Sequence, residues 1–306
     1  MRHNKAYLLL VYTFTEDKMH KDRKVAVVTG SSSGIGFEIS LALARNGYLT
    51  YATMRDLQKS RDLEEIAHDE NVSLNAIEMD VDYDHSVKNA IDKIIDESGR
   101  IDVLVNNAGF GLFGALEDLE IGEIKRQFET NVFGILRVTK NVLPTMRLRQ
   151  NGIIVNISSI AGLAGIPSQT IYCGTKFAVE GLSESLSFEV EPFGIKVIIV
   201  EPGVINTEFV RGLSVPTTIY GVGKNGEQIN SSVPKDKPSI SLSPYSSTIG
   251  KFLSFYFKAM SNAPHPQVVA NETIQAIQKV SDGYNTDSIL RVTVGNESKK
   301  YSDLKR

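Results

Sequence analysis

The sequence has little of what disulfide-bonded, metal-binding and nucleic-acid-binding proteins need. A single cysteine, Cys173, stands among 306 residues, which excludes an internal disulfide and fits a reducing compartment. The five histidines are scattered and no His/Cys cluster has metal-ligand spacing, so we expect no metal. The net charge of −3 gives no reason to expect nucleic acid as a partner. These absences favour a cytoplasmic protein.

A long apolar run is also missing. The apolar stretch 6–14 follows a short basic stretch, but it is far shorter than the roughly 20 residues that a membrane span needs. No convincing small-residue cleavage site follows it, which argues against a signal peptide. We therefore expect no membrane span, and we expect residues 1–21 to form a tail that contributes little to the core. Whether this tail is disordered or precedes a true start at Met19 stays open.

The chain does contain enough apolar material for a core. Hydrophobic residues make up 42% of the sequence and charged residues 23%, which suits a globular protein. The length is common for one α/β domain with an insertion. We therefore expect residues 22–306 to form a single domain.

A glycine-rich turn lies between a predicted strand and a predicted helix. The valine-rich stretch 24–29 predicts a buried strand, and apolar residues recur at helical spacing over 34–46. Gly30 and Gly34 can adopt backbone angles that other residues avoid, and Gly36 allows the helix to pack closely on the strand. Backbone N–H groups at such a helix start favour a phosphate. An ordinary tight turn is the alternative, because the spacing of the first two glycines differs from the usual dinucleotide fingerprint.

Strands and helices alternate along the chain, which predicts a parallel sheet covered on both faces. The predicted fold is a doubly wound, Rossmann-type α/β domain of about seven mostly parallel strands. The further strands are expected at 49–53, 74–79, 101–105, 152–157, 196–200 and 289–294. The further helices are expected at 60–70, 87–95, 118–144, 170–191 and 266–281.

The second predicted strand is followed by two charged residues, Arg55 and Asp56. In dinucleotide folds an acidic residue near this place holds the adenosine ribose, whereas an arginine accommodates a 2′-phosphate. Because we expect the strand to end at Met54, Asp56 falls in the next turn and Arg55 is better aimed. A solvated turn is the alternative for both residues.

The alternation of strands and helices breaks between Gly212 and Ser247, where the chain is rich in Ser, Pro, Gly and Asn. A loop of this length is usually a lid, a binding loop or disordered, and we expect a substrate loop over about 206–262. An apolar stripe at helical spacing follows within it, made by Ile249, Phe252, Leu253, Tyr256 and Met260. Packing on the core is the favoured interpretation of this stripe, and a roof over a hydrophobic substrate pocket is the other.

Tyr172 and Lys176 lie four residues apart, so they share one face of the predicted helix 170–191. A free tyrosine, with a pKa of about 10, is a poor base at neutral pH. The Lys176 ammonium would favour the phenolate and lower the pKa of Tyr172, which would make this residue a general acid and base. Ser159, expected at the mouth of the strand 152–157, could donate a hydrogen bond to a substrate oxygen. The Tyr-x-x-x-Lys pair alone is common by chance on helices.

Six short motifs occur in order, and together they are specific. They are TGSSSGIG at 29–36, NNAG at 106–109, Asn131, NISS at 156–159, YCGTK at 172–176 and PG at 202–203. With these motifs the chain resembles the short-chain dehydrogenase/reductase family over about residues 22–210. The segments 51–57, 109–114 and 172–186 look most like the hydroxysteroid and retinol dehydrogenase branch of that family.

The resemblance implies a nicotinamide cofactor and four catalytic residues. Tyr172 would give or take the proton, while Lys176 would bind the nicotinamide ribose and tune the tyrosine. Ser159 would orient the substrate carbonyl, and Asn131 would support a proton-relay water. The residues expected to bind the cofactor, beside Tyr172 and Lys176, are Gly30, Ser32, Ser33, Gly34, Ile35, Gly36, Arg55, Asp80, Val81, Asn107, Ala108, Gly109, Pro202, Gly203, Val204 and Thr207.

The cofactor preference depends on the end of the second strand. Met54 stands where NAD-preferring members of the family carry an acid, and Arg55 follows it, which favours NADP(H). The basic residue that some NADP-preferring members carry in the glycine turn is absent, since residues 31–33 are all serine. NAD(H) therefore stays possible.

The sequence predicts an NADP(H)-dependent oxidoreductase that interconverts a hydrophobic alcohol and its ketone or aldehyde. A catalytically silent nucleotide-sensing or scaffold protein is the main alternative, which the presence of Tyr172 and Lys176 disfavours. An epimerase or dehydratase of the related extended group would have a different glycine spacing. Family members assemble through the long helices that correspond to 118–145 and 170–191, so the resemblance implies a homodimer or homotetramer.

Overall fold

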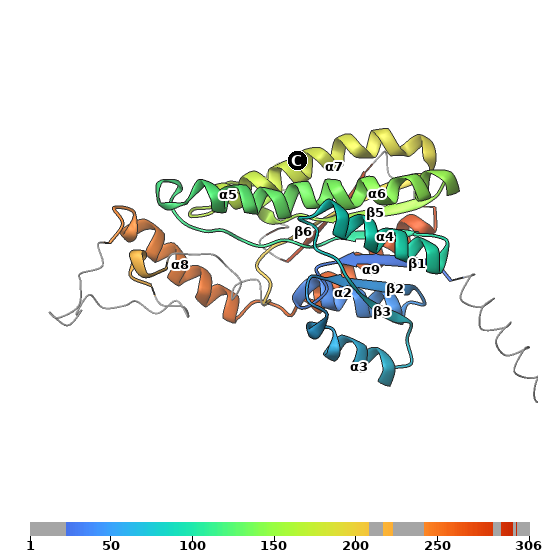
Figure 1. Cartoon of the computed structure of the whole chain (residues 1–306). Coiled ribbons are helices and arrows are strands. Elements are labelled where there is room, and N and C mark those ends of the chain that lie inside the picture. The colour runs from blue at the N-terminus through green and yellow to red at the C-terminus, as the bar shows by residue number, and fades with distance from the viewer. Residues whose placement is uncertain (1–22, 208–216, 223–241, 284–288, 296–297, 299–306) are drawn as a thin grey trace, which may run out of the picture.

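The computed structural model describes residues 23–207, 217–222, 242–283, 289–295 and 298. Within these residues seven strands form one sheet in the order β3-β2-β1-β4-β5-β6-β7, and all neighbours run parallel (Figure 1). The expected doubly wound α/β fold is confirmed. The order reverses between β1 and β4, where such sheets bind their ligands. The strands are β1 (Val25–Thr29), β2 (Leu49–Met54), β3 (Leu74–Glu78), β4 (Val103–Asn106), β5 (Gly152–Ile157), β6 (Ile195–Pro202) and β7 (Ile289–Val294).

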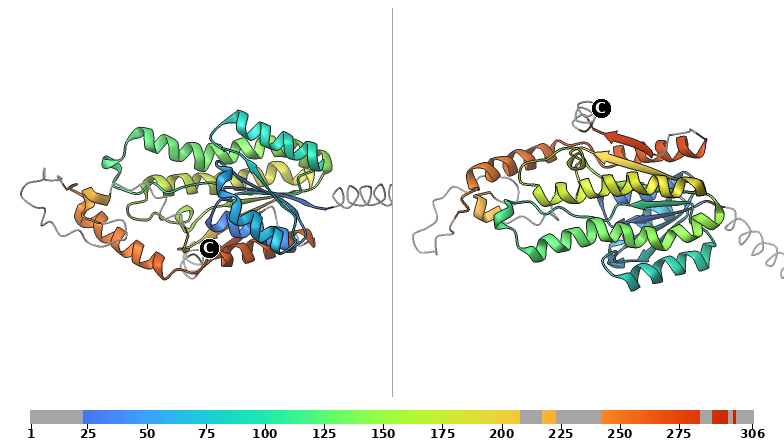
Figure 2. Two further views of the ribbon diagram at one scale, coloured as in Figure 1. Left: turned by 60° about the horizontal axis from the view of Figure 1, so that its bottom comes forward. Right: turned by 90° about the horizontal axis from the view of Figure 1, so that it is seen from above.

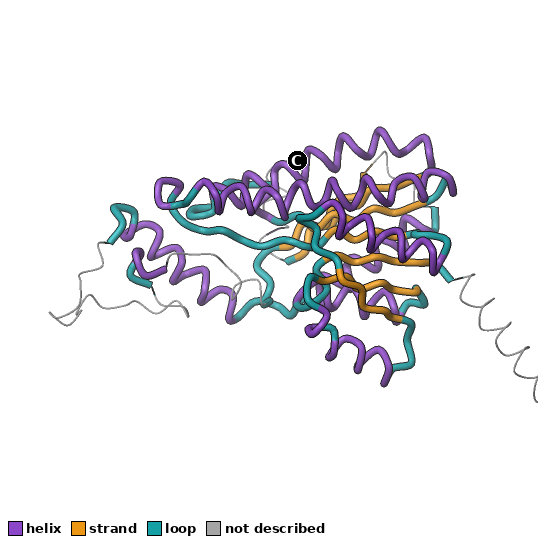
Figure 3. Tube along the Cα trace, in the orientation of Figure 1, coloured by secondary structure: helices purple, strands orange, loops and turns teal. Residues whose placement is uncertain are grey.

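Helices cover both faces of the sheet (Figure 2). One face carries α2 (Gly34–Arg45), α3 (Arg61–Asp69) and α9 (Gln267–Ser281). The other carries α4 (Asp84–Ser98), α6 (Gly134–Arg149) and α7 (Thr170–Val190). A further helix, α8 (Ser246–Ser261), lies apart from both layers, beyond the carboxyl ends of the strands (Figure 3).

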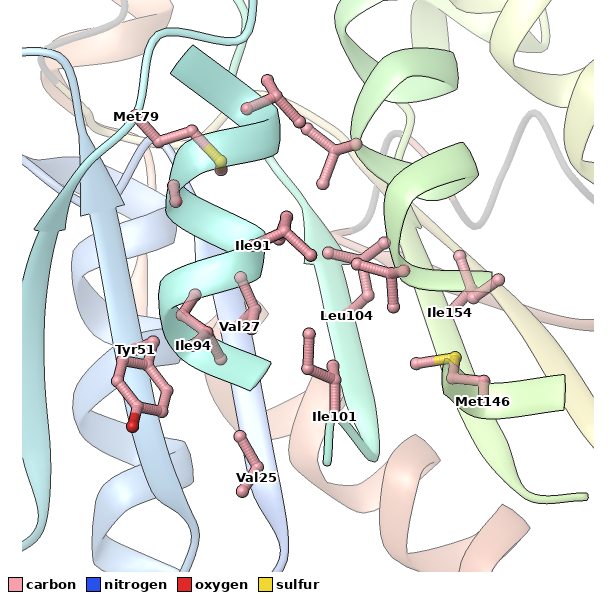
Figure 4. Close-up of a cluster of buried hydrophobic side chains, with 14 of the residues drawn as sticks. Val25, Val27, Tyr51, Met79, Ile91, Ile94, Ile101, Leu104, Met146 and Ile154 are labelled. Atoms are coloured by element: carbon pink, nitrogen blue, oxygen red, sulfur yellow. The ribbon is translucent and has the colours of Figure 1, made fainter. Parts of the chain in front are cut away.

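Two apolar cores flank the sheet, because alternate residues of a strand point to opposite faces. Val25 and Val27 of β1 belong to the core under α4 and α6, whereas Ala26 and Val28 belong to the core under α2 and α9. Figure 4 shows the first of these cores, with side chains of α4 and α6 directed at the strands. Burial on both faces explains why the central strands β1 and β4 are almost continuously apolar.

The single helix predicted over 118–144 is wrong in two respects. The structure divides this region into α5 (Ile121–Phe128), a π-helical turn (Glu129–Phe133) and α6. In addition, α6 continues through Pro144, where the sequence predicted its end. The missing N–H of a proline removes a helical hydrogen bond, but Met146 in the following turn is fully buried in the core and keeps the helix in place.

Two expected segments lie at least partly outside the described residues. One is the tail 1–21. The other is the substrate loop 206–262, of which residues 208–216 and 223–241 are outside, while a short 3-10 helix (Thr217–Tyr220) and α8 are described. In the described part of the chain, no helix combines the length and the apolar character that crossing a membrane requires.

Candidate active site

The turn between β1 and α2 leaves no space for a side chain at Gly30 or Gly36. Gly30 has a φ of +70°, and a Cβ at this position would lie 2.8 Å from the Cα of Ala108. A Cβ on Gly36 would lie 2.4 Å from the carbonyl oxygen of Gly30. Only glycine avoids these clashes, so the backbone is bare at these two positions near the start of α2. This cradle fits a phosphate-bearing cofactor.

Two side chains hold this turn against the end of β4. The Thr29 hydroxyl accepts the N–H groups of Asn107 and Ala108, each at 2.9 Å. The Asn107 side chain donates to the carbonyl oxygens of Thr29 at 2.9 Å and of Gly30 at 3.0 Å. These bonds join the carboxyl ends of β1 and β4, where the strand order reverses. Asn107 therefore shapes the turn as well as lining the space beside it.

A cavity of about 590 Å³ lies at this edge of the sheet, a volume typical of cofactor and substrate sites. The expected catalytic residues Ser159, Tyr172 and Lys176 line it. Gly36 and Asn131 do not, since Gly36 packs under the turn and Asn131 lies in the π-helical turn. The other residues expected to bind the cofactor all line the cavity: Gly30, Ser32, Ser33, Gly34, Ile35, Arg55, Asp80, Val81, Asn107, Ala108, Gly109, Pro202, Gly203, Val204 and Thr207.

Arg55 lines the cavity directly after β2, whose last residue, Met54, is buried. Asp56 is not part of the lining. Its carboxylate accepts the N–H of Gln58 at 3.0 Å and so caps the turn that follows. Arg55 is also close enough to Asp82 for its positive charge to lower the pKa of that carboxyl, although burial raises the pKa by more. The cavity wall at the end of β2 therefore carries the arginine and not the acid, as expected.

Tyr172 is only 8% exposed and lies at the cavity wall. Burial raises the pKa of its phenol well above the usual value, and a hydrogen bond with the Ser159 side chain opposes this rise. The expected lowering of the pKa of Tyr172 by Lys176 is therefore wrong, because burial of the phenol is the largest effect on this pKa and Lys176 is not among its causes. The phenol stays protonated at neutral pH, which suits a proton donor.

Lys176 contacts a strand end as well as the tyrosine ring. Its ammonium donates a 2.7 Å hydrogen bond to the carbonyl oxygen of Ile157, the last residue of β5, and lies 5.8 Å from the centre of the Tyr172 ring. Burial lowers the pKa of Lys176 to about 8, and the negative charge of Glu180 acts in the opposite direction. The charge on this lysine therefore changes within a readily measured pH range.

Asn131 acts on the site through a neighbouring backbone. Its side-chain oxygen accepts the N–H of Phe110 at 3.0 Å, and its amide group donates to the carbonyl oxygen of Phe110 at 2.9 Å. The same amide group donates to the Thr175 hydroxyl of α7 at 3.2 Å. Phe110 itself lines the cavity, so these bonds position part of the wall. The expected support of a relay water stays a prediction.

Aromatic residues of α8 supply much of the remaining wall. The Phe113 ring lies 5.9 Å from the Tyr172 ring and 5.3 Å from the Tyr256 ring, centre to centre. Ile249 and Leu253 of α8 are buried in the same cluster as Phe113. The apolar stripe of α8 thus packs on the protein and also lines the cavity, and its role as a roof over a hydrophobic substrate pocket stays a prediction. The lining residues of α8 are Phe252, Phe255, Tyr256 and Met260.

Asp118 ties this wall to the segment before α5. Its carboxylate accepts hydrogen bonds of 2.7 Å from the hydroxyl groups of Tyr220 and Ser243. The Tyr220 hydroxyl accepts the N–H of Ala115 at 2.9 Å, and the N–H of Ser243 donates to the carbonyl oxygen of Ile219 at 3.0 Å. Asp118 therefore holds two points of the expected substrate loop together.

A charged cluster lies behind Lys176 and joins α7 to β6 and β7. Arg291 of β7 pairs with Glu180 and Glu184 of α7, and with Glu201 of β6 at 2.6 Å. The Ser158 hydroxyl donates a hydrogen bond to Glu180. Glu180 thus stands between this cluster and Lys176, whose pKa it raises. Within the described residues, no group of histidine, cysteine or acidic side chains is arranged to hold a metal ion.

The motifs, the fold and these contacts agree with one known family. A family model described as short chain dehydrogenase matches residues 24–216. The chain belongs to the short-chain dehydrogenase family. It is an NAD(P)-dependent oxidoreductase of this family.

Several proteins resemble this short-chain dehydrogenase. The 3-ketodihydrosphingosine reductase of Bacteroides thetaiotaomicron is 44% identical over 193 residues, which cover 63% of the chain and 68% of that protein. Retinol dehydrogenase 8 of Bos taurus is 43% identical over 190 residues, which cover 61% and 60%. The solved structure of ElxO with NADP bound is 28% identical with a TM-score of 0.67, and the match covers 89% and 97%. Relatives named as retinol and hydroxysteroid dehydrogenases confirm the expected nearness to that branch.

Two residues that shape the site of this short-chain dehydrogenase were not predicted from the sequence. Thr29 carries a recognisable signal, because it is a buried polar residue that ends an otherwise apolar strand just before Gly30. Asp118 carries none, because its partners Tyr220 and Ser243 lie 102 and 125 positions away in the chain.

Proposed function

We propose that the protein is an NADP(H)-dependent oxidoreductase that interconverts a hydrophobic alcohol and its ketone or aldehyde. The observation that carries this proposal is the place of Tyr172. Its protonated phenol lies at the wall of a cavity whose lining combines the glycine turn with the aromatic side chains of α8. A proton donor between a cofactor cradle and an apolar wall suits the reduction of an apolar carbonyl.

Each polar group of the candidate active site would have a separate role in this reaction. The glycine turn and the residues after β2, β4 and β6 would hold the cofactor, which when bound would supply or accept the hydride. Ser159 would hold the carbonyl oxygen of the substrate, and Tyr172 would give this oxygen a proton. Lys176 would bind the ribose next to the nicotinamide and stabilise the phenolate that remains. Orientation of these groups, with proton supply, is the contribution of the protein.

NADP(H) is the proposed cofactor because of Arg55. A guanidinium at the end of β2 can bind a 2′-phosphate with two parallel hydrogen bonds. Met54 occupies the place of the ribose-binding acid and is buried, and Asp56 is engaged in its turn. The 28% identical structure of ElxO has NADP bound, which supports the same choice.

The assembly proposed for this chain is a homodimer or homotetramer. Several large apolar side chains are exposed near the junction of α5 with α6 and along α7, which is unusual for a solvated surface when they gather on neighbouring elements. Phe133 is 51% exposed and Phe188 65%. Leu182 is exposed on α7 as well. Contact between two copies through α6 and α7 would cover these side chains.

The proposed organisation is one catalytic unit over residues 22–306, with the substrate bound by the region 206–262. The described part of that region already supplies the aromatic wall of the cavity. A cytoplasmic location stays a proposal, and it rests on the single, buried cysteine.

A substrate screen tests the proposed function. Purified protein is incubated with NADPH or NADH and with steroids, retinoids, aliphatic ketones and aldehydes, and the loss of reduced cofactor is followed. We expect turnover of apolar carbonyl compounds, with NADPH preferred. Binding of NADPH without turnover of any compound would contradict the proposal and favour a silent nucleotide-sensing protein.

A further inference from the structure

The hydroxyl group of Tyr256 stands out in the apolar wall made by α8. Tyr256 lines the cavity together with Phe252, Phe255 and Met260, none of which carries a polar group. In the described part of the chain, no hydrogen bond to the Tyr256 hydroxyl is found. The hydroxyl of Tyr220, a residue of the same cluster, is by contrast bonded on both sides to protein groups.

The ring of Tyr256 does not need its hydroxyl group. It packs edge-on against Phe113 at 5.3 Å and stacks on Phe252 at 5.9 Å, and a phenylalanine would make both contacts. The hydroxyl is not among the buried side-chain atoms that lack a partner, so it is open to the cavity and a ligand can reach it. The hydroxyl is therefore better explained by a partner that enters the cavity.

Tyr256 and Tyr172 lie close together. Both rings pack on the same Phe113 side chain, and both residues line the cavity. Burial raises the pKa of the Tyr256 phenol, and the charge of Tyr172 adds to this rise, which requires the two phenol groups to be near each other. A ligand oxygen at Tyr172 would thus bring the atoms next to it within reach of Tyr256.

We propose that Tyr256 is a specificity-determining residue whose hydroxyl binds a second oxygen of the substrate, on the carbon next to the reacting carbonyl. This inference rests on the proposed function, since Tyr172 must hold the reacting oxygen. The substrate class that it names is an apolar chain or ring that ends in a hydroxyketone, or the corresponding diol in the reverse direction. Tyr256 donates or accepts one hydrogen bond, and the aromatic side chains of α8 contact the apolar remainder.

Matched pairs of ketones test this inference with NADPH as cofactor. The pairs are 2-octanone with 1-hydroxy-2-octanone, and cyclohexanone with 2-hydroxycyclohexanone. The wild-type enzyme should reduce the hydroxyketone of a pair with the higher kcat/KM. In Tyr256→Phe, kcat/KM for the hydroxyketone should fall at least about fivefold, as expected for a lost hydrogen bond, whereas the value for the plain ketone should change less than about twofold.

Two controls separate this role from a structural one. Tyr48→Phe changes a buried tyrosine that is not part of the cavity lining. This variant should leave kcat/KM unchanged for both ketones of a pair. Tyr256→Phe should keep the wild-type melting temperature and NADPH affinity.

The possible results distinguish this inference from the proposed function. If Tyr256→Phe lowers kcat/KM equally for both ketones, or for neither, the proposed role of Tyr256 is overturned and the proposed function stays intact. A wild-type enzyme that reduces plain ketones but no hydroxyketone also overturns the inference alone. A wild-type enzyme that binds NADPH and reduces no carbonyl compound at all overturns the proposed function, and the inference with it.

Discussion

The ammonium of Lys176 donates its hydrogen bond to the carbonyl oxygen of Ile157, at 2.7 Å. Ile157 ends β5, and Ser158 and Ser159 follow it directly. The bond therefore fixes the lysine to the same strand end that presents Ser159 to the cavity. Any change that weakens the charge of the lysine would act on the geometry of this strand end as well as on Tyr172.

Removal of the Tyr172 hydroxyl should abolish most of the activity. Positioned acid catalysis contributes about 10² to 10⁴-fold, so kcat of Tyr172→Phe should fall by at least about 100-fold. The aromatic ring stays, so the NADPH affinity, measured by fluorescence titration, should change little. Turnover above about one tenth of the wild-type value would show that Tyr172 is not the proton donor.

The pH profile should report the charge of Lys176. Because the pKa of Lys176 is lowered to about 8, the ammonium is present below this pH and is lost as the pH rises through it. The value of kcat/KM should therefore decline above about pH 8, since kcat/KM follows groups of the free enzyme.

Glu180 should control the position of this decline. The charge of Glu180 raises the pKa of Lys176, so Glu180→Gln should move the decline to lower pH. Glu184→Gln removes an equal charge from the same cluster, at a more exposed position, and should move it less. An unchanged profile in Glu180→Gln would contradict this electrostatic coupling.

Arg55 should determine the choice of cofactor. Charge-assisted hydrogen bonds to a phosphate are worth about 1.5–3 kcal/mol, so Arg55→Ala should reduce the ratio of kcat/KM for NADPH over NADH at least about tenfold. Lys59→Ala removes a nearby positive charge that does not line the cavity, and serves as the matched control. A wild-type preference for NADH would reject the phosphate contact.

Substitution of Asp118 should weaken substrate binding without changing cofactor binding. Asp118→Asn weakens the contacts with the hydroxyl groups of Tyr220 and Ser243, so KM for the carbonyl substrate should rise severalfold while the Kd for NADPH stays the same. The neighbouring carboxylate of Glu117 bonds the exposed Tyr245, and Glu117→Gln should have a smaller effect. Equal effects of the two variants would argue against a special role for Asp118.

The exposed side chains around Phe133 and Phe188 should hold two copies of the chain together. Light scattering of the wild-type protein should show at least twice the 33.7 kDa mass of one chain. A charge placed on α7 by Phe188→Asp should shift the protein towards the mass of a single chain. Tyr83→Asp changes another exposed aromatic residue, directly before α4, and should not shift the mass. A single-chain mass for the wild type at micromolar concentration would reject the assembly.

The sequence predicted the nucleotide side of the site better than the substrate side, for a physical reason. The cradle of Gly30, Gly34 and Gly36, and the pair Tyr172 and Lys176, depend on local backbone needs and on helical spacing, which short motifs record. Strand ends in a parallel sheet meet at one edge, so the order of the motifs also predicts that they come together.

Properties that depend on packing could not be predicted in this way. The pKa of Tyr172 depends on its burial, which the fold sets, and burial reversed the expected shift. The helix α6 continues through Pro144 because core contacts outweigh the loss of a hydrogen bond. The hydrogen bonds of Asp118 with Tyr220 and Ser243 join distant parts of the chain, so no local sequence pattern predicts them.

The aromatic cluster around Phe113 is separate from the two cores that flank the sheet. Contacts within such a cluster can open without unfolding the rest, because local openings cost only the contacts that they break. Amide hydrogen exchange in α8 would then be faster than in β1 or β4. Substitutions in α8 would also leave the stability of the sheet largely unchanged, so that the choice of substrate could diverge in evolution while the nucleotide half of the protein stays constant.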